Sequence, residues 1–273
     1  MELGLSHLPE REQKPRNTGI SVITDHGYGL VDSKSQVSDL STLIDLVKIS
    51  ISALHSGTSI KERLAFYRST GVQILLSGTI FEACYLRNEL DLFYKFIYDN
   101  EFDAVEISSS IIQIENEKKG EIIHRLASDF RVISELGYKQ NSALASSEIW
   151  NSFLLSDLQA GAWKIILEGG EAGKSYIFDE YGQPRENRIN AIAAKTGIQN
   201  LIWETPHPDQ QLWFVKKFGP GVNLANIHPG ELTRLESIRL GLHSETFFHE
   251  IPQKLLQGMT KTIDPLHDYD PQI

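Results

Sequence analysis

Residues 104–135 read AVEISSSIIQIENEKKGEIIHRLASDFRVISE, and this stretch contains the repeating unit of the whole chain. It opens and closes with a short run of strand-forming residues, and a glutamate follows each run directly, Glu106 after the first and Glu135 after the second. Between the two glutamates, residues 119–127 place apolar side chains at the i, i+3 and i+4 spacing of a helix. The stretch therefore predicts a strand, a crossover helix and a second, parallel strand.

The same unit recurs along the chain, with predicted strand ends 22 to 36 residues apart. The eight predicted strand ends fall at or beside Asp25, Lys48, Gly78, Glu106, Glu135, Glu168, Glu204 and Asn226. An open doubly wound sheet would need fewer strands or a glycine-rich first turn, and residues 25–29 (DHGYG) lack the dinucleotide-binding pattern. Eight units of strand plus helix predict an α/β fold, a closed (β/α)8 barrel of the TIM type.

The size of the chain fits one such barrel. With 273 residues, 41% of them hydrophobic, it can bury one large core, so we expect a single domain over residues 1–273 with its core at about 14–247. Residues 1–13 are expected to form an arm that is ordered only where it docks, and residues 249–273 a flexible tail rich in proline and acidic residues. Such a tail either frays or crosses to a neighbouring subunit, and we expect a homo-oligomer.

Composition excludes several classes of partner. A net charge of −10 argues against binding nucleic acid or anionic lipid, both of which require a basic surface. The sequence contains no apolar run of the ~18 residues that a membrane span needs, and its start is polar, so we expect a cytoplasmic protein. A single cysteine, Cys84, excludes an intrachain disulfide and a multi-cysteine metal site.

The predicted strand ends are rich in acidic side chains. Carboxyl ends of barrel strands face one common mouth, where we expect Asp25, Lys48, Glu82, Glu106, Glu135, Glu168 and Glu204 to converge, joined by Lys139 four residues past Glu135. Several carboxylates in one cleft repel each other unless a cation or lysines neutralise them, and oxygen ligands without His or Cys favour Mg²⁺. The alternative is that these carboxylates only cap helices or form ion pairs at the barrel rim.

Two other patterns near the mouth carry weaker predictions. Residues 168–175 (EGGEAGKS) differ from the phosphate-binding Walker loop by having Glu168 where the loop needs glycine, which disfavours a nucleotide site. His26, His207 and His243 fall in loops that we expect at the mouth, where each is either a solvated or packed side chain or an acid/base group.

The strand-end motifs together resemble the phosphosulfolactate synthase family over about residues 14–247. They include Asp25-x-Gly27, Val47-Lys48, Gly78-Thr79-Ile80-Phe81-Glu82, Val105-Glu106-Ile107-Ser108, Glu135-x-Gly137-x-Lys139, Trp203-Glu204-x-Pro206 and Phe218-Gly219-Pro220-x-Val222-Asn223-Leu224-Ala225-Asn226. The resemblance implies a lyase that adds sulfite to the methylene carbon of phosphoenolpyruvate with Mg²⁺ as cofactor, and therefore a small anionic substrate. In that chemistry negative charge develops on the substrate carboxylate, and a lysine protonates the carbon that carries the phosphate ester.

On this resemblance we expect Lys139 to donate the proton, with Lys48 and Glu135 as further catalytic residues. Expected metal ligands are Glu106, Glu168 and Glu204, and expected substrate-binding residues are Asp25, His26, Ser108, Asn223, Asn226, Arg239 and His243.

The chain departs from the family pattern at four cationic positions. It has His26, Tyr138, Gly170 and His243 where the family usually carries lysine or arginine. Each lost charge-assisted hydrogen bond to an anion costs roughly 1.5–3 kcal/mol. Three hypotheses follow: a family enzyme in the strict sense, a related barrel enzyme with a less anionic substrate, and a catalytically silent stress or scaffold relative.

Overall fold

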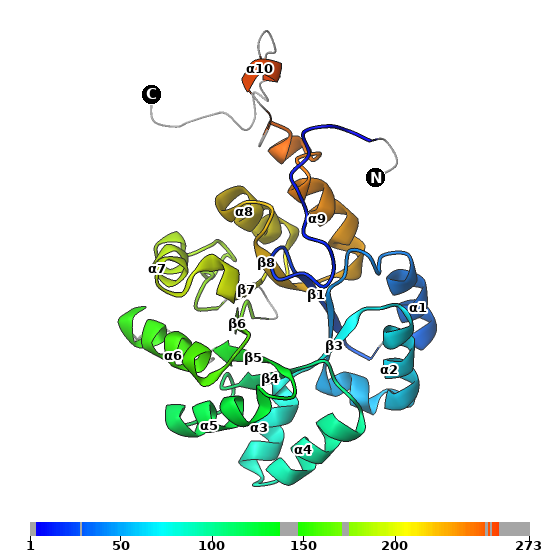
Figure 1. Ribbon diagram of the computed structural model, residues 1–273, viewed down its shortest axis with the longest axis vertical. Helices are drawn as coiled ribbons and strands as arrows, with labels where there is room; N and C mark the ends of the chain where they lie inside the picture. Colours follow the sequence, from blue (N-terminus) through cyan, green and yellow to red (C-terminus); the bar gives the residue numbers. More distant parts are fainter. Residues whose placement is uncertain are drawn as a thin grey trace.

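Eight strands form one closed parallel barrel in the computed structural model, which describes residues 4–27, 29–136, 147–170, 175–248, 251 and 253–256. Each strand pairs with the next along the chain, and β8 closes the barrel against β1 (Figure 1). The strands are β1 (Ser21–Asp25), β2 (Leu46–Ile49), β3 (Gln73–Leu76), β4 (Ala104–Ser108), β5 (Arg131–Leu136), β6 (Lys164–Leu167), β7 (Leu201–Glu204) and β8 (Asn223–Ile227). This strand order confirms the predicted (β/α)8 barrel.

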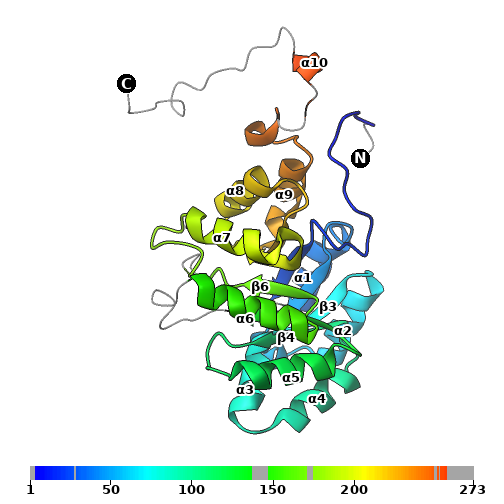
Figure 2. The ribbon, with the colours of Figure 1, turned by 60° about the vertical axis from the view of Figure 1, so that its left-hand side comes forward.

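Helices surround the barrel as an outer ring (Figure 1). The α-helices are α1 (Leu30–Ser38), α2 (Ile60–Ser69), α3 (Gly78–Leu86), α4 (Leu90–Asp99), α5 (Asn116–Leu126), α6 (Ser147–Ala160), α7 (Glu186–Thr196), α8 (Pro208–Phe218), α9 (Leu232–Arg239) and α10 (Gln253–Leu256). Four short 3₁₀ turns are η1 (Ile51–His55), η2 (Ile198–Asn200), η3 (Pro229–Glu231) and η4 (Ser244–Thr246). Figure 2 shows α10 outside the ring, beyond α8 and α9.

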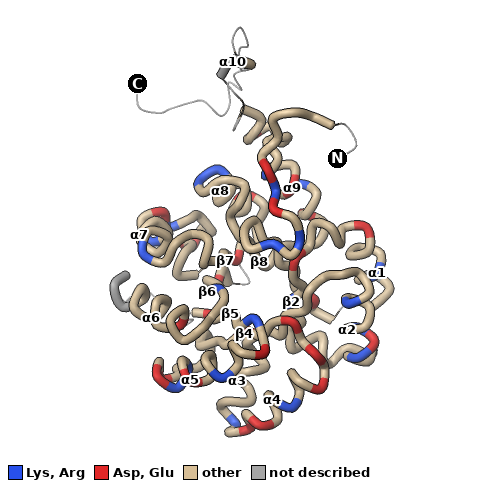
Figure 3. Tube along the Cα trace, in the orientation of Figure 1, with Lys and Arg blue, Asp and Glu red and all other residues tan. Residues whose placement is uncertain are grey.

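The outer helices carry charges of both signs. Figure 3 shows Lys and Arg interspersed with Asp and Glu along α4, α5 and α7.

Among the residues that the structure describes, no helix combines the length and the apolar character that crossing a membrane requires.

The interior of the barrel is apolar at first and becomes charged toward the carboxyl ends of the strands. The apolar layer consists of Ile20, Val22, Leu46, Leu75, Ala104, Ile133, Ile166, Ile202 and Ala225. Side chains two residues apart on a strand share a face, so the residues two positions after five of these also face the interior. They are Lys48, Glu106, Glu135, Glu168 and Glu204, which we call the charged layer.

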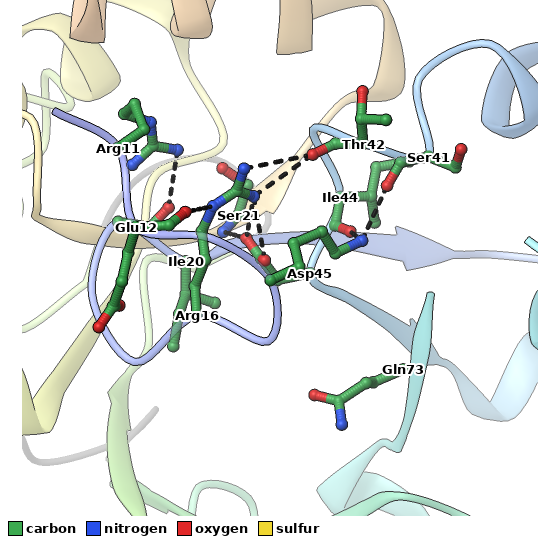
Figure 4. Close-up of polar contacts among 12 residues, drawn as sticks. Arg11, Glu12, Arg16, Ile20, Ser21, Ser41, Thr42, Ile44, Asp45 and Gln73 are labelled. Carbon is green, nitrogen blue, oxygen red and sulfur yellow. Dashed lines mark hydrogen bonds and ion pairs between the residues drawn. The ribbon is translucent and has the colours of Figure 1, made fainter. Parts of the chain in front are cut away.

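The N-terminal arm crosses the opposite, amino-terminal end of the barrel. Arg11 Nε lies 3.1 Å from Glu236 Oε1 on α9, and Arg16 Nη1 lies 3.1 Å from Asp45 Oδ1 just before β2 (Figure 4). Asp45 Oδ2 also accepts a hydrogen bond of 2.9 Å from the main-chain N–H of Ser21, at the start of β1. These contacts dock the arm from Arg11 onward.

Candidate active site

The charged layer is arranged around one buried lysine. Lys48 Nζ on β2 lies 2.7 Å from Glu204 Oε1 on β7 and 3.4 Å from Glu106 Oε1 on β4. Lys48, Glu106, Glu135 and Glu204 are all buried, and Glu168 is half-buried at the end of β6. The barrel thus brings together side chains that are up to 156 positions apart in the sequence.

Main-chain N–H groups hold the second oxygen of two of these carboxylates. Gly78 donates to Glu106 Oε2 at 2.7 Å, and Gly169 donates to Glu204 Oε2 at 3.2 Å. Both glycines allow a close approach, because a Cβ at Gly78 would come within 2.4 Å of Ser108 Cβ and one at Gly169 within 2.3 Å of the Glu204 carbonyl oxygen. The two carboxylates are therefore clamped between Lys48 and the main chain.

The pKa shifts in this layer reflect burial and an excess of negative charge. Burial raises the pKa of Glu135 well above its usual range, and the nearby carboxylates of Glu106, Glu204 and Glu168 raise it further against the attraction of Lys48. Burial also raises the pKa of Glu106, although Lys48 and the Gly78 N–H oppose it. Burial alone would lower the pKa of Lys48, but the surrounding carboxylates raise it well above its usual value. Lys48 therefore stays cationic, and the layer favours the uptake of a further proton or cation.

The charged layer has the oxygen ligands that a divalent cation needs, but its carboxylates are not grouped around one point. Carboxylate oxygens are the ligands that Mg²⁺ prefers, and one lysine does not neutralise four carboxylates. Within the described ranges, however, no three Asp, Glu, His or Cys side chains are grouped so as to hold one metal ion.

Asp25 and Glu82 have their carboxylates turned to the protein itself. Asp25 Oδ2 accepts hydrogen bonds from Arg63 Nη1 at 2.8 Å and from the Tyr67 hydroxyl at 2.7 Å, both on α2, and burial and this carboxylate raise the pKa of Tyr67. Glu82 was expected to converge on the mouth, but it accepts hydrogen bonds from three successive main-chain N–H groups, those of residues 110, 111 and 112, at 2.7–2.9 Å. It also binds the Ser108 hydroxyl. These two acids shape the loops after β1 and β4.

A cavity of about 640 Å³ opens at the carboxyl ends of β1 and β8. His26 and Asn226 line it, together with Ser33, Tyr67 and His228. Asn226 has a φ of 57°, in the left-handed region that costs a non-glycine residue backbone energy. The described residues that line this cavity include no lysine or arginine.

Three predicted substrate-binding residues, Asn223, Arg239 and His243, lie at the wrong end of the barrel. Asn223 begins β8, accepts a hydrogen bond from the Ile20 N–H at 3.0 Å and donates one to the Leu201 carbonyl at 2.9 Å. Arg239, at the end of α9, donates to the main-chain carbonyls of Val222 and Pro220. These contacts lie at the amino-terminal ends of β1, β7 and β8.

His243 follows α9, so it too lies on the amino-terminal side. Its Nδ1 accepts a hydrogen bond of 3.3 Å from the Glu245 N–H, and Glu245 pairs with Lys216 in the last turn of α8. Each helix in a (β/α)8 barrel runs from the mouth back to the opposite end, so the end of α8 marks that side. The structure thus places Asn223, Arg239 and His243 at the amino-terminal end and not at the mouth, where they were expected to bind substrate.

Other expectations meet the structure differently. Lys139, the expected proton donor, lies outside the described residues. Arg63 on α2 and Lys119 on α5 are buried cations that were not singled out in the sequence. Each carried a signal, since each stands in an apolar stripe at helical spacing, Lys119 together with Ile122, Ile123 and Leu126.

Comparisons with known proteins find relatives over most of the chain. A family model described as (2R)-phospho-3-sulfolactate synthase (ComA) matches residues 9–245. The phosphosulfolactate synthase of Methanothermobacter thermautotrophicus is 34% identical over 244 residues, which are 87% of this chain and 95% of that protein. The Bacillus subtilis enzyme is 33% identical over 244 residues (88% and 97%), and the Methanocaldococcus jannaschii enzyme 35% over 236 residues (84% and 94%).

Solved structures show the fold alone. Orotidine 5′-phosphate decarboxylase from Pyrococcus horikoshii matches with a TM-score of 0.53 at 12% identity, covering 80% of this chain and 98% of its own. The YdjI aldolase from Escherichia coli matches with a TM-score of 0.51 at 9% identity, covering 88% and 91%. Both likenesses are to the barrel, whereas the family match and the curated relatives extend over most of the sequence. The chain belongs to the phosphosulfolactate synthase family.

Proposed function

We propose that this protein catalyses the addition of sulfite to phosphoenolpyruvate, which makes it a lyase that forms phosphosulfolactate. Family membership supports the reaction. The observation that carries it is the position of Lys48, held between Glu106 and Glu204 and next to Glu135 in the interior of the barrel mouth. Such a site is built to hold and stabilise charge away from bulk water.

The reaction needs a positive charge and a proton at defined places. The sulfur lone pair of sulfite attacks the methylene carbon, and the electron pair of the double bond moves toward the substrate carboxylate. The adjacent carbon, which carries the phosphate ester, then takes up a proton, so that one carbon–sulfur and one carbon–hydrogen bond form. Lys48 stabilises the developing negative charge, because its raised pKa keeps it cationic.

Lys139 is the proposed proton donor, and Glu135 is proposed as a further catalytic residue. The support for Lys139 is its place in the sequence, four residues after Glu135. The support for Glu135 is its burial next to Lys48 and its raised pKa, which favours a protonated, hydrogen-bonding carboxyl group.

Mg²⁺ is the proposed cofactor, held by Glu106, Glu168 and Glu204. The surplus of negative charge in the charged layer supports it. The bound ion would supply Lewis-acid stabilisation of the substrate's carboxylate charge.

The substrate is proposed to extend from the charged layer into the cavity at β1 and β8. His26 and Asn226 line this cavity, and Asp25 shapes its wall through Arg63 and Tyr67. Ser108, at the end of β4, is proposed to contact the substrate from the other side of the mouth.

A second candidate is the same chemistry on a less anionic substrate. The lining of the cavity favours it, since the described polar residues there are histidines, neutral hydrogen-bonding groups and Asp25, which is paired with Arg63, and none is a lysine or arginine. Competition among phosphoenolpyruvate and enol substrates that lack the phosphate would separate the two candidates.

The test is direct formation of product. Purified protein is incubated with Mg²⁺, phosphoenolpyruvate and sulfite, and the mass of phosphosulfolactate is followed, with reactions lacking sulfite or treated with a chelator as controls. Metal-dependent product supports the proposal, and none from folded, metal-loaded protein overturns it.

Two further expectations stay predictions: a homo-oligomer and a cytoplasmic location. Light scattering coupled to size-exclusion chromatography would test the first, and cell fractionation the second.

A further inference from the structure

A fully buried ion pair lies behind β5, on the side away from the barrel interior. Lys119 on α5 and Asp157 on α6 join these neighbouring helices, with Nζ 3.0 Å from Oδ2 and both side chains 1% exposed. Lys119 shares the apolar face of α5 with Ile122, Ile123 and Leu126. Charges placed there are costly unless their hydrogen-bonding groups are satisfied.

The end of β5 supplies hydrogen-bond partners to both members of the pair, although Asp157 Oδ1 is buried without a partner among the described residues. Lys119 Nζ donates to the main-chain carbonyl of Glu135 at 3.0 Å, and the Ser134 hydroxyl donates to Asp157 Oδ2 at 2.6 Å. Lys119 Nζ also lies 3.4 Å from the Ser109 hydroxyl, and the Ser109 N–H donates to the same Glu135 carbonyl at 3.3 Å. Two helices and the end of β4 thus meet at the main chain of one residue of the charged layer.

Glu135 needs such an anchor. Its carboxyl group belongs to the charged layer around Lys48, and its main chain is at the end of β5. A strand end that was free to shift would carry this carboxyl group away from Lys48, and a shift of about 1 Å is enough to impair catalysis. We propose that Lys119 and Asp157 are positioning residues, which hold the main chain of Glu135 from behind so that its carboxyl group stays beside Lys48.

The competing explanation is that the pair only stabilises the packing of α5 against α6. The two explanations differ in where the effect of a substitution would appear. A pair that only packs helices would change the stability of the fold, whereas a positioning pair would change turnover and the local order at the ends of β4 and β5.

The kinetic part of the test rests on the proposed function. Lys119→Met should lower kcat roughly 10- to 100-fold and change KM less than about 3-fold, because the substrate contacts remain while the geometry for reaction is lost. The double variant Lys119→Met/Asp157→Asn removes both charges, so it avoids an unpaired buried ion and secures a folded protein for the same measurement.

The matched control is the neighbouring lysine. Lys118 is 57% exposed and pairs with Glu115 at 2.8 Å on the surface of the same helix, so Lys118→Met should leave kcat unchanged. Asp157→Asn keeps an acceptor for Lys119 and Ser134 and should retain more activity than Lys119→Met. If the double variant turns over as fast as Lys118→Met, the inference is overturned.

A second readout does not depend on activity. Amide hydrogen exchange should become faster in peptides that cover residues 104–110 and 131–136 of the double variant, while the rest of the described chain exchanges as in the wild type. Uniformly faster or unchanged exchange would overturn the inference. Should the wild type form no product, this measurement alone decides it, so failure of the proposed function remains distinguishable.

Discussion

Both ends of the barrel bury charged side chains, but among the described residues the carboxyl end gathers several carboxylates around one lysine. At the amino-terminal end Arg16 pairs with Asp45 (Figure 4), and Arg11 pairs with Glu236. At the mouth, Lys48 is in contact with Glu106 and Glu204 and lies close to a third carboxylate, Glu135.

Arg239 is a buried cation at the amino-terminal end, and main-chain carbonyl groups accept its hydrogen bonds. Burial lowers its pKa to about 9, and its guanidinium donates to main-chain carbonyls instead of facing a cluster of acids. Its Nη1 and Nη2 atoms donate to the main-chain carbonyls of Val222 and Ile20, and these bonds join α9 to the amino-terminal ends of β8 and β1. On the proposed function, we expect the amino-terminal end to supply stability and the mouth, whose charges are held but not neutralised, to supply the chemistry.

Of the substitutions at the two ends of the barrel, Lys48→Met should reduce turnover the most. It removes the cation that stabilises charge in the reaction, so kcat should fall by about 10³-fold or more. Product formation measured by mass spectrometry checks this.

Lys14→Met is the control at the other end. Lys14 is half-buried and donates to the Ser41 carbonyl at 2.9 Å. It should lose stability while kcat stays within about 2-fold of the wild type. An equal loss of turnover in both variants would remove the functional difference between the two ends.

Asn223→Ala should lower the stability of the fold without lowering turnover. It leaves the Ile20 N–H and the Leu201 carbonyl without their buried partner, at about 1–3 kcal/mol for each group. We expect a loss of about 2–4 kcal/mol in the free energy of unfolding, measured with urea, and unchanged kcat. A rise in KM alone, at full stability, would return Asn223 to the substrate site.

Mg²⁺ should stabilise the wild type through the charged layer. At about 100 times its dissociation constant, a ligand that binds only the native state adds about 2.7 kcal/mol, which raises Tm by several degrees. The rise in Tm is measured when Mg²⁺ is added to protein that has first been stripped of metal with a chelator. Glu168→Gln should reduce this rise. An identical shift in wild type and variant would exclude Glu168 as a ligand.

Glu135→Gln should stabilise the metal-free fold at neutral pH by on the order of 1 kcal/mol. The pKa of Glu135 is raised in the folded state, so its contribution to stability is present below the unfolded pKa and is lost as pH rises through the folded value. The gain from glutamine should therefore be absent in acid and appear as pH rises through that window. Urea titrations at a series of pH values measure it, and a gain that is the same at every pH would show that the charge of Glu135 is not its cause.

Asn226 should give the smallest effect. Its left-handed backbone suits glycine, so Asn226→Gly should stay within about 1 kcal/mol of the wild type, and Asn226→Ala should be less stable than Asn226→Gly by about 1 kcal/mol. If the side chain binds substrate, both variants raise KM. Equal KM values in all three proteins would show that the Asn226 side chain does not bind substrate.

The sequence predicted the barrel and the charged layer for the same reason. Strand-forming runs that end in a charged residue recur at the spacing of one strand plus one helix, and glutamate is a poor strand former without a role there. The clearest members, Glu106, Glu135 and Glu204, lie where they were expected.

What the sequence could not predict is which end of an element a polar residue occupies. Asn223 and Asn226 are both on β8, but three residues span about 10 Å, enough to separate the entrance of the barrel from its mouth. The roles of Glu82 and Lys119 depend on loops and helices brought together only in the folded barrel. Their pairing partners, residues 110–112 and Asp157, are 28 to 38 positions away.

On the proposed function, the charged layer carries the chemistry and the amino-terminal end does not. The most direct test compares phosphosulfolactate formation from phosphoenolpyruvate and sulfite by wild type, Lys48→Met and Lys14→Met, at equal concentrations of folded, Mg²⁺-loaded protein. We expect product from wild type and Lys14→Met at similar rates and almost none from Lys48→Met. Product from Lys48→Met at the wild-type rate would contradict the role of the charged layer.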